Sequence, residues 1–168
     1  MTGSAGSATG QQRSAARLAA VQALYQIELN RDDAEGVILA FRTHGFPVEQ
    51  GREAMVDPDV DLFADVVRGA TRRQAEIDRL LSETLVKGWP LERLESVLRA
   101  ILRAGTYELL LRGDIPPKVI INEYIEIAHA FFSGDEIRMT NGVLDRVAHH
   151  LRSGEFDGGN DDRPAEAG

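Results

Sequence analysis

Apolar residues recur every three or four positions through most of this chain, and this spacing constrains the fold more than any other feature of the sequence. It is the period of an α-helix that packs one face against a core. From Arg13 to Asn30, the stripe consists of Leu18, Val21, Leu24, Tyr25 and Leu29. No segment shows the strict alternation typical of a β-strand, so the sequence predicts an all-α protein.

Glycine and proline residues divide this pattern into six or seven helices. We predict helices over residues 13–30, 35–43, 59–86, 91–112, 118–132 and 136–152. Ser14 is a candidate N-cap for the first helix. Residues 46–58 form a longer connection, and the other connections are mostly short. Helices joined in this way pack into a compact helical bundle.

The two ends of the chain lack the apolar residues that a folded core needs. Because such segments bury too little surface to offset the entropy of ordering, we predict a disordered N-terminal arm over residues 1–12. We predict a disordered acidic tail over residues 154–168 for the same reason. One folded domain spans residues 13–153, which is long enough to bury a single sizeable core.

Composition excludes several classes of protein. The chain has no Cys, which rules out disulfides and Cys-based metal sites. No apolar run approaches the roughly 18–20 residues that span a bilayer, and the N-terminus lacks a signal-peptide core, so we expect a cytoplasmic protein without membrane association. The net charge of −8 disfavours a surface covered with cations, although three Arg against one Glu in residues 1–31 leave room for a local basic patch.

The sequence carries no sign of catalysis. The histidines, which are His44, His129, His149 and His150, show no metal-ligand spacing, and a solvated helix end is the better interpretation of the adjacent pair. No glycine-rich phosphate loop follows a strand, and most carboxylates lie on the outer faces of the predicted helices. We therefore predict no metal site, no cofactor and no enzymatic activity.

Two carboxylates, Glu108 and Glu123, interrupt apolar helix faces and need partners if they are buried. We expect a structural role for both. Glu108 would accept hydrogen bonds from free backbone amides at the start of a neighbouring helix, and Arg103 is its candidate ion partner.

Gly105 and Gly142 lie inside helices at a cost of about 1 kcal/mol each relative to Ala, so we expect another helix to approach closely at both.

The first helix carries a weak indication of RNA binding. Arg13 and Arg17 are four residues apart and share one face, and Tyr25 follows two turns later. Arginines neutralise phosphates and exposed aromatic rings stack on unpaired bases. Lys118 and Arg138 would extend this patch if the fold brings the starts of their helices beside the first helix. On spacing alone, two arginines on a helix more often form a solvated face.

Several motifs occur in an order and spacing that are specific to one family. They are AVQALY (20–25), LERL (91–94), LRAGTYELL (102–110), PPKVIINEYIEIA (116–128) and TNGVLDR (140–146). The matches run in this order across about residues 13–152, nearly the whole predicted folded part, and on them the chain resembles the NusB transcription-antitermination family.

The resemblance implies two small bundles, of three-helix type, packed across each other, and a non-enzymatic adaptor. It also implies binding to boxA-type RNA together with NusE, which is also a small-subunit ribosomal protein, and action on elongating RNA polymerase during ribosomal RNA transcription. Matched residue by residue, the RNA face would consist of Arg13, Arg17, Gln22, Tyr25, Lys118, Asp135, Arg138 and Asn141. The NusE face would lie within residues 91–99, where Glu92 and Glu95 are exposed by the helix period.

The chain departs from the family pattern at two places. Ser14, Ala15 and Ala16 dilute the usual run of arginines, and Met139 replaces a Phe that would be a better stacking surface. A protein-only adaptor or dimerisation module with weakened RNA binding therefore stays an alternative, and whether the protein forms a homodimer stays open.

The same helical domain precedes ribosomal RNA cytosine methyltransferases, but this chain has no Cys nucleophile and ends before a catalytic domain, so we do not expect that enzyme.

Overall fold

The computed structural model describes residues 8–46, 56–85 and 89–153, and these residues form helices without any β-strand. The elements of these ranges are α1 (Gly10–Asn30), α2 (Ala34–His44), α3 (Val60–Arg72), α4 (Gln74–Thr84), the 3-10 turn η1 (Leu91–Arg93), α5 (Ser96–Leu111), α6 (Pro117–Phe131) and α7 (Asp135–Leu151). The predicted all-α fold is confirmed.

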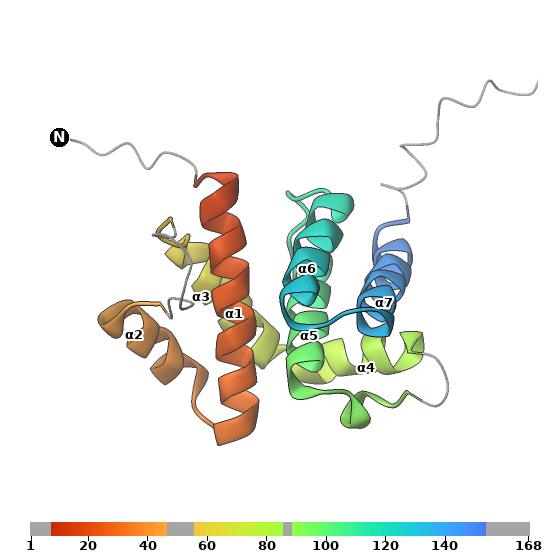
Figure 1. Cartoon of the computed structure of the whole chain (residues 1–168), viewed down its shortest axis with the longest axis horizontal. Coiled ribbons are helices and arrows are strands. Elements are labelled where there is room, and N and C mark those ends of the chain that lie inside the picture. The colour runs from red at the N-terminus through yellow and green to blue at the C-terminus, as the bar shows by residue number, and fades with distance from the viewer. Residues whose placement is uncertain (1–7, 47–55, 86–88, 154–168) are drawn as a thin grey trace, which may run out of the picture.

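The helices form two bundles that lie side by side (Figure 1). Helices α1, α2 and α3 make the first bundle, and α4 to α7 make the second. Helix α5 is at the centre, because it packs against α6 and α7 in its own bundle and against α1 and α3 in the other. The prediction of two packed bundles is confirmed, although the second contains four described helices instead of three.

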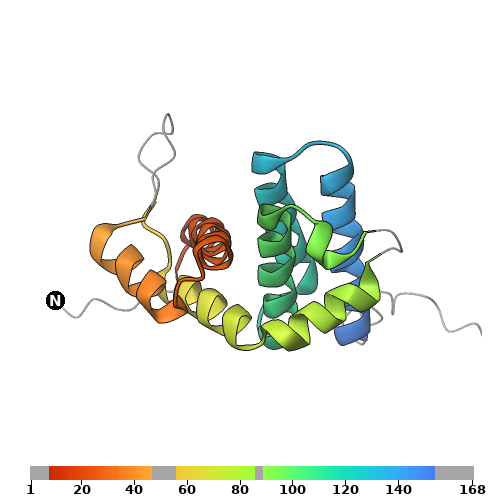
Figure 2. The same ribbon diagram turned by 90° about the horizontal axis from the view of Figure 1, so that it is seen from below.

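The segment predicted as one helix over residues 59–86 is two helices that meet at Arg73. The backbone of Arg73 has φ −103° and ψ 17°, outside the helical region, and its amide donates to the carbonyl of Gly69. The bend turns α4 beneath the second bundle, where Ile77 and Leu81 are buried (Figure 2). Because the apolar stripe continues through the bend, periodicity does not reveal it.

The predicted helix over residues 91–112 is also interrupted. After η1 the backbone of Leu94 is extended, with φ −67° and ψ 151°, and α5 begins only at Ser96. The guanidinium of Arg99 donates to the carbonyls of Leu91 and Glu92, at 3.3 and 3.2 Å, and to that of Leu94. A side chain thus replaces the backbone hydrogen bonds that a continuous helix would have made.

Helix α1 begins three residues before its predicted start. Thr9 is the N-cap, and it exchanges hydrogen bonds with Gln12 in a capping box. Ser14, the predicted N-cap, therefore lies inside the helix, where its hydroxyl hydrogen-bonds with the carbonyl of Gly10 and with Glu123. Of the predicted arm, residues 8–12 are described and 10–12 are helical. The rest of the arm, the predicted tail and residues 47–55 of the long connection lie outside the described residues.

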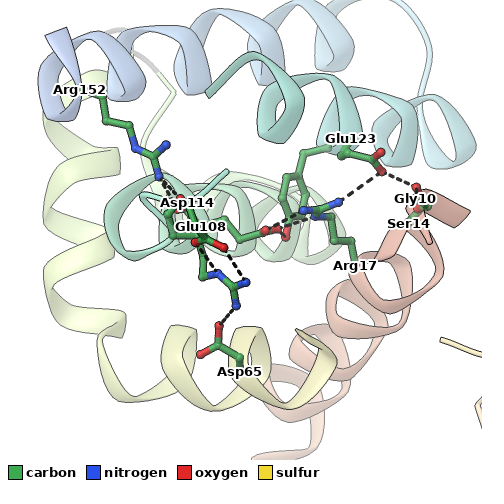
Figure 3. A network of polar contacts seen from close by, with 10 residues as sticks. Gly10, Ser14, Arg17, Asp65, Glu108, Asp114, Glu123 and Arg152 are labelled. Carbon is green, nitrogen blue, oxygen red and sulfur yellow. Dashed lines mark hydrogen bonds and ion pairs between the residues drawn. The ribbon is translucent and has the colours of Figure 1, made fainter. Parts of the chain in front are cut away.

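The side chain of Arg152 closes the C-terminal end of α5 (Figure 3). This residue follows α7 and is buried. Its guanidinium donates at 2.6–3.0 Å to four carbonyl groups, those of Glu108, Leu109, Arg112 and Ile115. The carbonyls of Glu108 and Arg112 also accept backbone amides, so the arginine adds a second donor there, and it supplies a donor to those of Leu109 and Ile115. These bonds fix the residue that follows α7 against the end of α5 and the turn after it.

Candidate RNA interface

A buried polar cluster joins the two bundles where α1, α5 and α6 meet (Figure 3). Arg17 of α1 donates from Nε and Nη2 to the two carboxylate oxygens of Glu108 in α5, at 2.8 and 3.0 Å. The hydroxyl of Tyr124 in α6 donates to the same carboxylate. The exposed fractions of Arg17 and Glu108 are 2% and 0%. Glu108 is therefore satisfied by side chains, and the prediction that it binds backbone amides is wrong.

The position of Arg17 contradicts its predicted role as a phosphate ligand. Its guanidinium faces the interior, although it shares a helix face with the exposed Arg13. Burial opposes the charged form, but hydrogen bonding and the charge of Glu108 outweigh it and raise the pKa of Arg17. An arginine held in this way stabilises the contact between the bundles and is not available to RNA.

Glu123 fastens α6 to the first half of α1. Its Oε2 atom accepts a hydrogen bond from Ser14 Oγ at 2.7 Å and lies 3.8 Å from Nη1 of Arg17 (Figure 3). The side chain is half-buried. Its predicted structural role therefore has a clear physical basis in these contacts.

Arg103 does not pair with Glu108, as the sequence suggested. It donates to both carboxylate oxygens of Asp78 in α4, at 2.8 and 3.0 Å, and to Glu28 in α1 at 2.9 Å. Five residues separate Arg103 from Glu108, which places their side chains about 140° apart around α5. Arg99 also donates to Glu28, so this network ties the second half of α1 to the second bundle.

Two of the helical glycines allow close packing, and only one of them is a predicted position. A Cβ at Gly105 would lie 3.0 Å from Leu144 of α7, as expected for close approach of another helix. Among the described residues, a Cβ at Gly142 would meet Arg146 of the same helix, at 3.4 Å, and no other helix, so that prediction is wrong. The sequence analysis missed Gly69 in α3, where a Cβ would lie 2.1 Å from the ring of Tyr107.

Two buried tyrosines should resist ionisation until the protein unfolds. Burial and the carboxylates of Glu108 and Asp65 raise the pKa of Tyr124 and of Tyr107 well above the ordinary value of 10.0. A group whose pKa is higher in the folded protein contributes stability below its unfolded pKa, and this contribution is lost as the pH rises further. Absorbance at 295 nm should therefore show two of the three tyrosines ionising only with alkaline unfolding, which circular dichroism reports in parallel. Ionisation of all three before unfolding would contradict the burial of these phenols.

Five of the other predicted RNA-binding residues form two clusters. Helices α1 and α6 run in the same direction (Figure 1), so the exposed Arg13 and Lys118 lie near the start of these helices, at one end of the molecule. The second cluster lies beyond the other end of α6, in the first turns of α7, and consists of Asp135, Arg138 and Asn141. Arg138 forms an ion pair with Asp135. Since α6 has 15 residues, about 22 Å separates the two clusters.

A groove with a volume of about 760 Å³ lies between α1 and α6, and we call it the α1–α6 groove. Its lining residues are Gly10, Gln11, Ser14, Ala15, Leu18, Val56, Glu123, Glu126, Ile127 and Ala130. Gln22 and Tyr25 follow Leu18 at intervals of four and three residues, so they continue the face of α1 that lines the groove. Both side chains are half-buried. The groove therefore lies along the side of α1 that carries two of the predicted RNA-binding residues.

The predicted partner surface consists of exposed residues in and beside η1. Glu92 and Glu95 are exposed, while Leu91 and Leu94 are buried beneath them. Trp89, which the sequence analysis did not select, is 49% exposed and precedes this turn by two residues. Trp is enriched among the residues that dominate binding energy in protein interfaces. Trp89 is distinguished from a core residue by its solvent exposure, which is not visible in the sequence.

Neither a metal site nor a membrane span is present within the described residues. Across residues 8–46, 56–85 and 89–153, no three His, Asp or Glu side chains are grouped so as to bind a metal ion. In the same ranges, no helix combines the length and hydropathy required to cross a bilayer.

Comparison with known proteins identifies the family. The family model described as "NusB family" matches residues 14–149. The chain is 45% identical over 144 residues to the transcription antitermination protein NusB of Nitrobacter hamburgensis, an alignment that covers 86% of this chain and 90% of that protein. It also matches a solved structure of T. maritima NusB, with a TM-score of 0.70 and 33% identity over 86% of this chain and 96% of that one.

A solved complex of the antitermination factors NusB and NusE with double-stranded RNA has the same fold. It matches with a TM-score of 0.68 over 84% of this chain and 99% of that one, at 20% identity. Because the NusB family consists of non-enzymatic transcription antitermination factors, the prediction that the protein is not an enzyme is confirmed. The chain belongs to the NusB family.

Proposed function

We propose that this protein is an antitermination factor that binds boxA-type RNA together with NusE. It acts on elongating RNA polymerase during ribosomal RNA transcription, in the cytoplasm. The observation that carries the RNA-binding part is the position of Arg13 and Lys118, two exposed cations at the same end of α1 and α6. The NusB structure solved with NusE and RNA, which shares this fold, supports the proposal.

The charge of the protein favours joint binding with a partner. The net charge is −8, and RNA phosphates are repelled by an acidic surface. A few exposed cations therefore give weak non-specific affinity, and a basic partner that contributes phosphate contacts would raise it. Glu92, Glu95 and the exposed Trp89 form a surface suited to such a partner, because carboxylates complement a basic protein and Trp is frequent among residues that dominate binding energy.

Arg13→Ala should weaken RNA binding and reduce its dependence on salt. Each lost phosphate contact lowers the slope of log affinity against log salt by about 1. The measurement is fluorescence anisotropy of a labelled boxA-type RNA over a range of salt concentrations, with and without NusE. Arg79→Ala, which removes an exposed arginine from α4, is the matched control and should leave the slope unchanged. Equal slopes for the two variants would remove Arg13 from the RNA face.

The burial of Arg17 favours a second candidate function, a protein-only adaptor, since it removes one cation from the expected RNA face. The same titrations separate the two candidates. Binding that is sensitive to salt and strengthened by NusE supports the antitermination complex. Association with NusE without RNA binding in any condition would leave the protein-only adaptor, and sedimentation of the same samples would report whether the protein is a monomer or a homodimer.

A further inference from the structure

The acidic tail, which consists of residues 154–168, begins at the end of the molecule that carries two exposed cations. Arg152 directly follows α7 and donates to the carbonyl of Ile115 at 2.6 Å, so the last described residues lie beside the start of α6. Lys118 and Arg13 are exposed in the first turns of α6 and α1. The starts of these two helices and the end of α7 lie at the same end of the molecule (Figure 1).

The two cations have no carboxylate partner among the described residues. The guanidinium of Arg13 donates to the carbonyl of Ala8 at 2.7 Å, and no described side chain forms an ion pair with Arg13 or Lys118. The carboxylates that flank Lys118 in the sequence, Asp114 and Glu123, are already bound by other side chains. The first turn of α6 contains no acidic residue, so the positive end of the helix dipole adds to the charge of Lys118. We call the surface formed by Arg13 and Lys118 the cationic end.

The tail has the charge and the length to reach the cationic end. One arginine and five carboxylates give it a net charge of −4, and the carboxylates are Glu155, Asp157, Asp161, Asp162 and Glu166. An extended chain spans at most about 3.3–3.6 Å per residue, so the nine residues from Ser153 to Asp162 cover up to about 30 Å. A helix is about 10–12 Å across. Because α6 packs against both α7 and α1, this length is sufficient to cross α6.

We propose that the acidic tail occupies the cationic end when no RNA is bound and competes there with the phosphates of the RNA. This inference rests on the proposed RNA-binding function. Carboxylates and phosphates are both acceptors for Arg and Lys side chains, so the same two cations cannot serve both at once. Because the tail is tethered within the same chain, its effective concentration at this surface is on the order of millimolar. RNA therefore gains the contacts of the cationic end only by displacing the tail.

The absence of Cys makes this contact directly measurable. An Asn160→Cys variant carries a single thiol, to which a nitroxide spin label can be attached among the carboxylates of the tail. At low salt, the label should broaden the NMR signals of amides around Arg13 at the start of α1. High salt should remove this broadening, because it screens exposed charges. Amides around Arg79 in α4, at the other end of the molecule, are the internal control and should keep sharp signals (Figure 1).

Neutralising the tail separates a bound tail from a general effect of net charge. The tail variant is Asp157→Asn/Asp161→Asn/Asp162→Asn. The matched control is Asp32→Asn/Glu76→Gln/Glu83→Gln, which removes the same charge from exposed residues at the end of the molecule away from the tail. At low salt, the tail variant should bind a labelled boxA-type RNA about three- to tenfold more tightly than the control, as expected for the loss of a few competing surface ion pairs. This difference should disappear at high salt.

The outcomes distinguish this inference from the function on which it rests. Broadening around Arg13 that added RNA reverses, together with tighter RNA binding by the tail variant, is the expected result. If the label leaves these amides sharp, or the tail variant binds RNA no more tightly than the control, the inference is overturned. In that case, a loss of affinity in Arg13→Ala still supports the RNA-binding function. If neither the parent nor the tail variant binds RNA, the proposed function fails and the competition fails with it.

Discussion

Replacing Arg17 alone by Met should lower the free energy of unfolding by about 3–5 kcal/mol. The substitution leaves the carboxylate of Glu108 buried without its cation, with only the hydroxyl of Tyr124 as a donor. A buried charge that loses its partner is strongly destabilising, because the protein cannot replace the lost hydration. Urea denaturation followed by circular dichroism measures the change.

Removing the whole cluster should restore most of that stability. The triple variant Arg17→Met/Glu108→Leu/Tyr124→Phe replaces the charges and the hydroxyl with apolar groups of similar size, a change that is often neutral. It is the control that separates an unpaired charge from a loss of packing. A triple variant as unstable as Arg17→Met, or a single variant within 1 kcal/mol of the parent, would contradict the buried-pair explanation.

Gly69→Ala should destabilise the protein by about 3 kcal/mol, at the upper end of the usual range for overpacking. The new Cβ would lie 2.1 Å from Cζ of Tyr107, too close for any real contact. The ring has little freedom to move, since its hydroxyl donates to Asp65 at 2.6 Å and Arg112 holds the same carboxylate at 2.9 Å. Helices α3 and α5 would have to separate, and thermal denaturation would detect the loss.

Gly142→Ala provides the matched control with the opposite sign. Among the described residues, the side-chain atom that the new Cβ would meet is the flexible end of Arg146, at 3.4 Å. In the interior of α7, Ala is favoured over Gly by up to about 1 kcal/mol, so this variant should be slightly more stable than the parent. If both substitutions shift the melting temperature in the same direction, the close contact between Gly69 and Tyr107 does not control the stability of the protein.

The sequence determines which face of each helix is apolar, but not which helix covers that face. This is why the all-α fold and the need of Glu108 for a partner were predictable, whereas the identity of the partner was not. Arg17 precedes Glu108 by 91 residues, and nothing local distinguishes it from a solvated arginine. The bend at Arg73 escaped prediction for a related reason, since the apolar pattern of α3 continues into α4.

The candidate RNA face was only partly predictable from the family resemblance. Matching motifs selected Arg13 and Lys118, which are exposed, but also Arg17, which is buried. Matching the sequence to the family's motifs identifies which positions correspond, but it carries no information on whether their side chains are exposed to solvent. The α1–α6 groove was not predictable either, because it depends on how α6 packs beside α1.

The contacts of Arg152 have a consequence for the order of events during synthesis on the ribosome. The four carbonyls that it satisfies are made 37 to 44 residues before its guanidinium exists. At about 5–20 residues per second, the end of α5 remains without this partner for on the order of 2–9 seconds. During that interval the carbonyls of Glu108 and Arg112 have their backbone donors, but those of Leu109 and Ile115 lack the arginine and are left to water, so the end of α5 is not fixed in the nascent chain until α7 has been made. A ribosome that pauses within α7 would therefore hold a chain whose first bundle is largely made and whose second bundle is still accessible to proteases and chaperones.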